Sequence, residues 1–219
     1  MKNFSELGLS EAVAHAIANL GFEKPTPIQA QVIPAMLESA KDLIALAQTG
    51  TGKTAAFGIP LVELIDTSAK KPQALILAPT RELAIQTAEE IKSFKGSKKI
   101  WITTVYGGAP ISSQMRELEK GTHVVVGTPG RVIDLIERKK LKLEDVKYVV
   151  LDEADEMLNM GFKEDIDEIL STTPAEKNVW LFSATMPREV REIAKKYMSN
   201  PKELTMGERN QGNENIDHQ

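Results

Sequence analysis

A glycine- and threonine-rich segment carries the clearest chemical signal in the sequence: Ala47-Gln48-Thr49-Gly50-Thr51-Gly52-Lys53-Thr54. It follows the apolar run 43–47 and precedes a helical pattern, which is the setting of a phosphate-binding loop (P-loop). Glycines let backbone amides turn toward the β- and γ-phosphates of a nucleotide, the lysine supplies a positive charge, and the final hydroxyl can ligate Mg²⁺. The general pattern begins with glycine, so Ala47 departs from it, and a glycine-rich turn that caps a helix is the alternative.

An acidic cluster, Asp152-Glu153-Ala154-Asp155, follows the strand-like run 148–151. In a nucleotide site, Asp152 would hold Mg²⁺, and Glu153 would orient and deprotonate a water molecule for in-line attack on the γ-phosphate. Taken alone, such a cluster is also typical of a helix amino terminus, where the helix dipole favours acidic side chains. We predict that Lys53, Asp152 and Glu153 are catalytic, and that Thr54 and Asp152 ligate Mg²⁺, partly through water.

Short apolar runs indicate the elements that must position these residues, at 43–47, 74–78, 101–105, 123–126, 148–151 and 179–182. Most are continuous rather than alternating, as expected for strands that are buried on both faces. Trp101 and Trp180 lie in these runs and are expected in the core. Helical spacing lies between the runs, so we predict an α/β domain with a mostly parallel sheet sandwiched between α-helices.

Composition excludes several classes of protein. The chain has 219 residues and no cysteine, which removes disulfides, thiol nucleophiles, zinc fingers and iron–sulfur clusters, and any metal should be bound through oxygen. No apolar stretch reaches the ~18 residues of a membrane span, and the amino terminus does not resemble a signal peptide. We therefore expect a cytoplasmic protein with no membrane partner. A net charge of −4 argues against a strongly basic duplex-binding protein, so any nucleic acid must be bound locally.

The acidic cluster resembles the signature of the DEAD-box ATP-dependent RNA helicases of superfamily 2. The surrounding motifs match the amino-terminal RecA-like domain of that family over about residues 4 to 206. In that family Ala47 is the usual first residue of the loop. The resemblance implies a RecA-like P-loop domain over 1–206 that binds ATP, Mg²⁺ and RNA, and that couples ATP hydrolysis to local unwinding of RNA duplexes or remodelling of RNA–protein complexes.

The resemblance also implies a partner that this chain does not contain, the carboxy-terminal RecA-like domain of the same protein. The polar stretch 207–219 is expected to begin the interdomain linker. Because the second domain carries the arginine fingers, worth about 10³ to 10⁵ in rate, we expect this chain to bind adenine nucleotide but to be nearly inactive in hydrolysis and unwinding.

The segment 21–29, GFEKPTPIQ, resembles the Q motif of the family, and Phe4 would be its isolated upstream aromatic. The resemblance implies that Phe22 stacks on adenine and that Gln29 reads the edge of the base. A side-chain amide both donates and accepts, so it can pair with N6 and N7 of adenine. Core packing of Phe4 and Phe22, and a surface position for Gln29, are the alternatives. The predicted ATP site comprises Phe4, Phe22, Gln29, Gln48, Thr49, Gly50, Thr51, Gly52, Lys53 and Thr54.

Three further segments resemble RNA-contact motifs: Pro79-Thr80-Arg81, Gly107-Gly108 and Thr128-Pro129-Gly130-Arg131. A phosphodiester can bind amides at a helix start or a glycine turn, and arginine adds charge without reading base identity. Each follows a predicted strand, and ligands of open α/β sheets gather at the carboxyl ends of the strands. We therefore expect single strands or short duplexes of RNA to bind here whatever their sequence. Any one of these motifs could instead be a turn with a solvated arginine.

The segment Ser183-Ala184-Thr185 resembles the third motif of the family. The resemblance implies that both hydroxyls contact the acidic cluster near Asp155 and couple the state of ATP to RNA binding; a helix cap before Pro187 is the alternative. The lysine-rich runs 92–99 and 138–142 could extend the RNA path, but solvated surface is the favoured interpretation. A P-loop ATPase of another kind and a non-catalytic RNA-binding module are the competing functional hypotheses.

Overall fold

The computed structural model of the protein describes residues 3–38 and 41–206, so the predicted linker 207–219 lies outside the described residues. A seven-stranded sheet forms its centre, in the order β3-β4-β2-β5-β6-β1-β7, and every strand pair is parallel. The predicted α/β fold is thereby confirmed. The strands are β1 (Leu43–Leu46), β2 (Ala74–Leu77), β3 (Ile102–Val105), β4 (Val124–Gly127), β5 (Tyr148–Leu151), β6 (Asn178–Ser183) and β7 (Lys202–Thr205).

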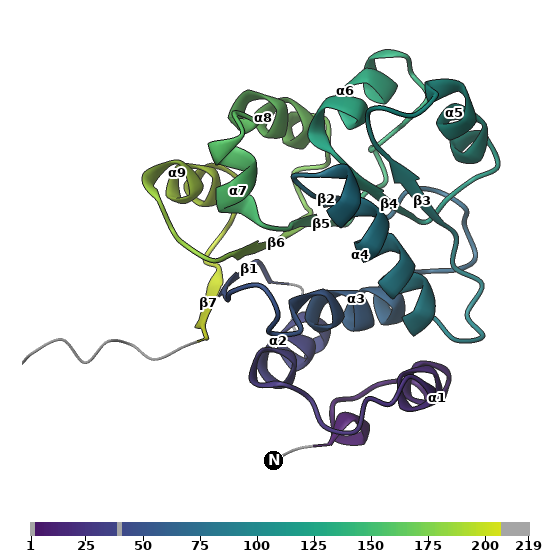
Figure 1. The fold of residues 1–219 in the computed structure, drawn as a ribbon, viewed down its shortest axis with the longest axis vertical. Coiled ribbons are helices and arrows are strands. Elements are labelled where there is room, and N and C mark those ends of the chain that lie inside the picture. The colour runs from purple at the N-terminus through teal and green to yellow at the C-terminus, as the bar shows by residue number, and fades with distance from the viewer. Residues whose placement is uncertain (1–2, 39–40, 207–219) are drawn as a thin grey trace, which may run out of the picture.

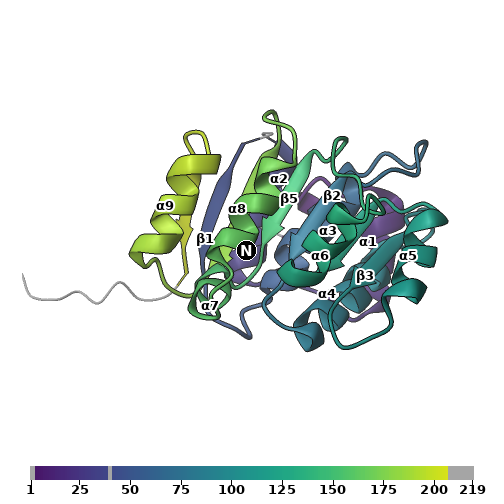
Figure 2. The same cartoon turned by 90° about the horizontal axis from the view of Figure 1, so that it is seen from above.

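Helices cover both faces of the sheet (Figure 1). One face packs against α1 (Glu11–Asn19), α2 (Pro27–Glu38), α3 (Lys53–Leu64) and α4 (Arg81–Phe94). The other face packs against α5 (Ile111–Glu119), α6 (Pro129–Glu137), α7 (Ala154–Asn159), α8 (Lys163–Ser171) and α9 (Arg188–Tyr197). Seen from above, α9 lies at the β7 end of the sheet and α5 at the β3 end (Figure 2).

The continuous apolar runs are explained by burial on both faces. In β4, Val124 and Val126 belong to the apolar core on the α1–α4 side, whereas Val125 belongs to the core on the α5–α9 side. All three side chains are fully buried. Because successive side chains of a strand point to opposite faces, a central parallel strand needs an apolar residue at every position.

The edges of the sheet differ from the sequence-based prediction. The strand β7 was not predicted, because three of its four residues, Lys-Glu-Leu-Thr, are polar and exposed, as an edge strand allows. The expectation that Trp101 is a core residue is wrong: it precedes the edge strand β3 and its side chain is 54% exposed. Trp180, in the interior strand β6, is fully buried as predicted and stacks on Tyr148 with ring centroids 5.1 Å apart.

The helices that follow two of the predicted RNA-contact segments begin with different caps. The Thr80 hydroxyl accepts a hydrogen bond from the Leu83 amide at 3.2 Å and caps α4. Thr128 lies at the same position before α6, but its side chain makes no capping hydrogen bond, and Pro129 alone marks the helix start. Within the described ranges, no helix is long and apolar enough to span a membrane.

Gly127 closes β4 where the chain has no room for a side chain. A Cβ there would lie 2.6 Å from Val105 Cγ2 and 2.7 Å from Val132 Cγ2. We expect Gly127→Ala to cost about 1 to 3 kcal/mol through overpacking, and thus to lower Tm by roughly 2 to 12 °C in thermal unfolding. Gly130→Ala is the matched control, because a Cβ at Gly130 meets nothing within 4 Å. Equal Tm values for the two variants would contradict this account of the packing.

Candidate functional site

The motif-bearing loops all leave the carboxyl edge of the sheet, because every strand runs in the same direction. The strand order divides this edge into two parts. The loops after β3, β4 and β2 carry Gly107-Gly108, Thr128–Arg131 and Pro79–Arg81, in that spatial order. The ends of β5, β6 and β1 carry the acidic cluster, Ser183–Thr185 and the phosphate loop. The acidic cluster therefore lies between the predicted RNA contacts and the predicted ATP site.

The phosphate loop connects β1 directly to α3. Gly50 and Gly52 have φ angles of 81° and 83°, in the left-handed region that glycine adopts at little cost. The Thr51 hydroxyl donates to the carbonyl of Gln48 at 2.7 Å and closes the loop on itself. Gln48, Thr49 and Gly50 are exposed at its tip, while Lys53 begins α3 and is buried.

Lys53 joins the phosphate loop to the acidic cluster across the intervening strand β6. Its Nζ atom lies 3.1 Å from Asp152 Oδ1 and 3.3 Å from Glu153 Oε1. The residues predicted to be catalytic from two motifs 100 positions apart are thus in direct contact. Lys53 is 7% exposed and Asp152 fully buried, so these charges interact with little screening by water.

The carboxylate of Asp152 is fully buried and has few partners among the described residues. Burial raises the pKa of its carboxyl group above the ordinary value, and the Lys53 ammonium only partly opposes this effect. Apart from that ion contact, neither carboxylate oxygen accepts a well-formed hydrogen bond in the described structure. Buried polar atoms are nearly always hydrogen-bonded, and Mg²⁺ prefers carboxylate oxygens. The residues present therefore fit a hard divalent cation.

Glu153 occupies a strained backbone conformation at the turn from β5 into α7. Its φ and ψ are 50° and 53°, the left-handed region that residues other than glycine seldom adopt. Such strain costs about 1 to 3 kcal/mol and is concentrated at functional sites. Here it directs the Glu153 carboxylate toward Lys53.

Asp155, Ser183 and Thr185, predicted from different segments, form one hydrogen-bonded cluster. The Asp155 carboxylate accepts from the Thr185 hydroxyl at 2.8 Å and from the Thr185 amide at 3.0 Å. The Ser183 hydroxyl accepts from the Asp155 amide at 3.2 Å and donates to the Thr185 carbonyl at 2.7 Å. Ser183, the last residue of β6, is fully buried, so the cluster joins the first turn of α7 to the end of β6.

Gln29 binds the phosphate loop through its side chain. It is 2% exposed rather than on the helix surface; its Nε2 atom donates to the Gly52 carbonyl at 3.1 Å and its Oε1 atom accepts from the Thr26 amide at 3.0 Å. The Thr26 hydroxyl adds a bond to the Thr51 carbonyl at 3.0 Å. A side-chain amide has two hydrogens and two lone pairs, so one donor and one acceptor remain for a base. Thr26 is a loop-supporting residue that the sequence analysis did not identify.

The aromatic residues of the predicted ATP site lie deeper than expected. Phe4 is 5% exposed and packs edge-to-face on Phe22 with ring centroids 5.9 Å apart, and Phe22 packs in the same way on Phe94. The alternative of core packing describes Phe4 well, whereas Phe22 is only partly buried. A hollow of about 580 Å³ opens beside the loop and is lined by residues that include Pro27, Ile28, Gln48, Gly50 and Met206.

On the other part of the edge, two arginines of the predicted RNA motifs have different surroundings. Arg81 is exposed, with its guanidinium 4.9 Å from the centre of the Tyr106 ring. Arg131 instead donates to the Ala109 carbonyl at 3.1 and 3.2 Å and to Gln114 Oε1 at 2.9 Å. Arg131 therefore braces the loop that carries Gly107-Gly108, a role that depends on Gln114 and that no local pattern in the sequence indicates.

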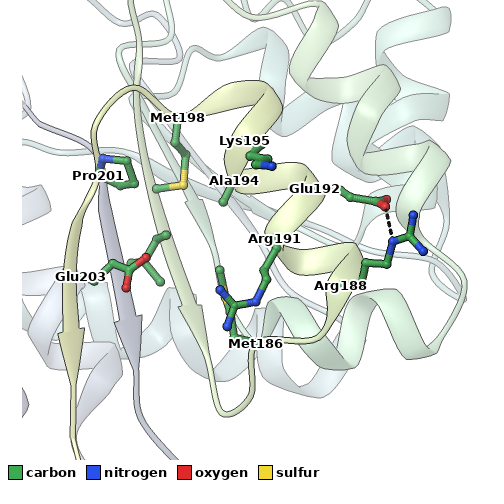
Figure 3. Close-up of a pocket in the computed structure, with 10 residues that line it drawn as sticks. Met186, Arg188, Arg191, Glu192, Ala194, Lys195, Met198, Pro201 and Glu203 are labelled. Atoms are coloured by element: carbon green, nitrogen blue, oxygen red, sulfur yellow. Dashed lines mark hydrogen bonds and ion pairs between the residues drawn. The ribbon is translucent and has the colours of Figure 1, made fainter.

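A separate hollow of about 720 Å³ lies between α9 and the strands β1 and β7 (Figure 3). Its walls include Arg191, Met198 and Glu203, and Arg188 at its rim pairs with Glu192 at 3.0 Å. It contains none of the predicted site residues. The hollow beside the phosphate loop, and not this one, therefore adjoins the candidate chemistry.

Comparison with known proteins agrees with this geometry. The family profile described as DEAD/DEAH box helicase matches residues 26–193, which is most of the chain. The chain belongs to the DEAD/DEAH box helicase family. Among solved structures, a DEAD box protein from Methanococcus jannaschii superposes with a TM-score of 0.90 at 52% identity, covering 93% of this chain and 55% of that one. A hypothetical ATP-dependent RNA helicase from Sulfolobus tokodaii superposes with a TM-score of 0.83 at 37% identity. This match covers 90% of this chain and 57% of that one. These matches confirm the RecA-like fold of this DEAD/DEAH box family member.

Relatives of this DEAD/DEAH box family member are also found by sequence. The chain is 57% identical over 201 residues to the DEAD-box ATP-dependent RNA helicase CshA of Geobacillus kaustophilus, and 54% identical over 203 residues to the RNA helicase CrhR of Synechocystis. These alignments cover 92% and 93% of this chain but 43% and 41% of the relatives. The chain therefore spans about two-fifths of the length of the curated relatives that it matches.

The Gln29 contacts generate a prediction for nucleotide binding and for stability. We expect Gln29→Ala to lower the free energy of unfolding by about 1 to 3 kcal/mol, because two backbone groups lose their buried partner. The same variant should weaken discrimination between ATP and GTP. Thermal unfolding and calorimetric titration measure the two effects. Gln86→Ala, at an exposed position of α4, is the control, and unchanged stability and discrimination in Gln29→Ala would refute both roles.

The Asp155 cluster generates a prediction for pH dependence. Burial alone would raise the pKa of the Asp155 carboxyl group, but hydrogen bonds, chiefly from the Thr185 side chain, outweigh it and lower the pKa. A lowered pKa in the folded state adds stability above the unfolded value, and this is lost as the pH falls through the folded value. Asp155→Asn should therefore destabilise the protein at pH 7 by about 0.5 to 1.5 kcal/mol, a modest amount because Asp155 is partly exposed to solvent, and by less below about pH 4. Urea unfolding at several pH values checks this, and a pH-independent difference would contradict it.

Proposed function

We propose that this chain is the ATP- and RNA-binding amino-terminal half of a DEAD-box RNA helicase, which couples ATP binding and hydrolysis to local unwinding of RNA duplexes or remodelling of RNA–protein complexes. The observation that carries the proposal is the contact of Lys53 with Asp152 and Glu153, at 3.1 and 3.3 Å. Three predicted RNA-contact loops leave the same edge of the sheet.

In this proposal the residues of the phosphate loop and of the acidic cluster have different roles in phosphoryl transfer. Amides of Gln48 to Thr54 bind the phosphates, and Lys53 exchanges its carboxylate partners for phosphate oxygens. Thr54 and Asp152 hold Mg²⁺, which supplies a positive charge against the γ-phosphate when it is bound. Two carboxyl groups face one ammonium group in this cluster, so a polyanionic nucleotide needs an accompanying cation. Glu153 orients the attacking water and accepts its proton.

RNA binds in this proposal to the loops after β2, β3 and β4. Arg81 and the open amides of Gly107, Gly108 and Gly130 contact phosphates, while Arg131 holds one of these loops in place. The Asp155–Ser183–Thr185 cluster joins the segments after β5 and β6, next to the predicted RNA loop after β2, and couples the state of ATP to RNA binding. We further propose that hydrolysis and unwinding require a second RecA-like domain that supplies the arginine fingers, and that the protein works in the cytoplasm, which agrees with the absence of cysteine.

The decisive experiment compares steady-state ATP hydrolysis, with and without single-stranded RNA, in this chain and in a longer chain that carries the second domain. We expect turnover that RNA stimulates in the longer chain only. In that chain, Glu153→Gln should lower kcat by about 10² to 10⁴-fold, while nucleotide binding is kept, because only the base is removed. Glu156→Gln, an exposed position on α7, is the control.

Two results would overturn the proposal. Unchanged hydrolysis in Glu153→Gln would remove the assigned base. Robust turnover by the 219 residues alone, indifferent to RNA, would favour a P-loop ATPase of another kind.

A further inference from the structure

The amino-terminal end of the edge strand β3 presents an exposed aromatic side chain beside a cation. Trp101 is 54% exposed, and the Lys70 ammonium lies 4.4 Å from the centre of its ring. A hollow of about 160 Å³ next to it is lined by Lys70, Lys140 and Lys142, among other residues. We call Trp101 and these three lysines the Trp101 patch. It lies at the end of the sheet opposite to the motif-bearing loops.

The backbone of Trp101 is held firmly although its side chain is open to solvent. Its amide donates to His123 Nδ1 at 2.9 Å, and its carbonyl accepts from the His123 amide at 2.9 Å and from the Thr122 hydroxyl at 3.1 Å. His123 is fully buried, and burial lowers the pKa of its imidazole, which keeps the accepting nitrogen unprotonated. The indole is therefore presented from a rigid support, which reduces the entropy lost when a ligand stacks on it.

The charge of the patch contrasts with that of the whole chain, whose net charge is −4. Lys140 pairs with Glu119 at 2.8 Å, with both side chains about half exposed. Within the described ranges, Lys70 and Lys142 form no ion pair. Gly121 packs closely on the Lys70 stem, since a Cβ at Gly121 would lie 3.0 Å from Lys70 Cβ. The aliphatic stem of Lys70 therefore lies along Gly121, and its ammonium group lies at the indole.

We propose that the Trp101 patch is a second contact for single-stranded RNA, in which a base stacks on the indole and the lysines bind the adjacent phosphates. An aromatic platform beside lysines is the combination with which proteins bind single strands without sequence preference. An acidic protein segment would use the lysines but would leave the aromatic face without a planar partner. The inference rests on the proposed RNA binding and extends it to residues outside the motifs.

The path between the two contacts has a defined length. Trp101 and Gly107 lie at opposite ends of β3, six residues apart, which is at most about 20 Å of extended chain. A stacked strand covers about 3.4 Å per nucleotide, so roughly six nucleotides bridge the distance along this edge. A short RNA can therefore occupy the motif loops alone, whereas a longer one reaches the Trp101 patch.

Tryptophan fluorescence of this chain tests the proposal, because Trp101 is exposed and Trp180 is fully buried. We expect an oligouridine of about 15 nucleotides to quench the emission of Trp101, and one of about 5 nucleotides to quench it far less. Trp101→Leu should abolish the quenching and weaken the affinity for the longer RNA roughly 5- to 150-fold, with no effect on the shorter one. Trp101→Phe should restore part of the affinity, because phenylalanine keeps an aromatic face.

Lysine variants test whether RNA binds to the Trp101 patch in particular or to positive charge anywhere on the surface. Lys70→Ala should weaken binding of the longer RNA and lower the salt dependence of its affinity by about 0.7 in slope. Lys202→Ala, exposed on the opposite edge strand β7, is the matched control and should change neither. Polyglutamate serves as a polyanion without bases and should not quench Trp101.

The outcomes distinguish this inference from the proposed function. If both RNAs bind wild type and Trp101→Leu equally well, the Trp101 patch is not an RNA contact, and the proposed function stands. If Arg81→Ala abolishes binding of the short RNA but the longer RNA still quenches Trp101, the two contacts are separate, as proposed. Quenching by polyglutamate equal to that by RNA would make the patch a site for acidic chains and overturn the inference. No binding of either RNA would overturn both.

Discussion

The common direction of all seven strands is the constraint on which the rest of the structure depends. Parallel strands need crossover connections, and helices on both faces of the sheet supply them. Each inner strand is therefore buried on both of its faces. The same direction places every strand-to-helix turn at one edge. Six of these turns bear polar or glycine-rich motifs, so chemistry that is scattered over residues 47 to 185 gathers along a single line. Helix amino ends also point at this line, which favours anions there.

Strand order then decides which motifs are neighbours. The acidic cluster follows β5, which pairs with β2 on one side and with β6 on the other. It therefore borders a predicted RNA loop and the Ser183–Thr185 segment at once, and Asp155 touches the latter through three hydrogen bonds. Lys53 reaches the same cluster from β1, over the end of β6. Because both neighbours adjoin the acidic cluster, the proposed coupling between nucleotide and RNA would act through the surroundings of Asp152 and Glu153.

The sequence predicted those features that rest on local pattern or on general chemistry. Six strands, the P-loop and the meeting of Lys53 with Asp152 follow from continuous apolar runs and from what a phosphate site requires. The features that the sequence did not predict depend on where an element lies in the sheet or on which other element it packs against. The apolar run that contains Trp101 does not reveal that its strand lies at an edge, and β7 has a single apolar residue, Leu204, which is too little to indicate a strand. Arg131 looks like a free cation, because its partner Gln114 comes from another helix. Gln29 was predicted to face a base, and its two bonds to the backbone are visible only when α2 and the loop are placed side by side.

The position of β1 in the sheet has a consequence for how the protein is made. Although β1 is the first strand of the described residues, both of its neighbours, β6 and β7, are the last two. A ribosome must add more than 130 residues after Leu46 before Asn178 begins the first of them, which takes on the order of ten seconds at 5 to 20 residues per second. During that time the strand before the P-loop has no hydrogen-bonded neighbour, while β2, β3, β4 and β5 can already pair. The nucleotide site is therefore completed after the part of the sheet that carries the predicted RNA loops.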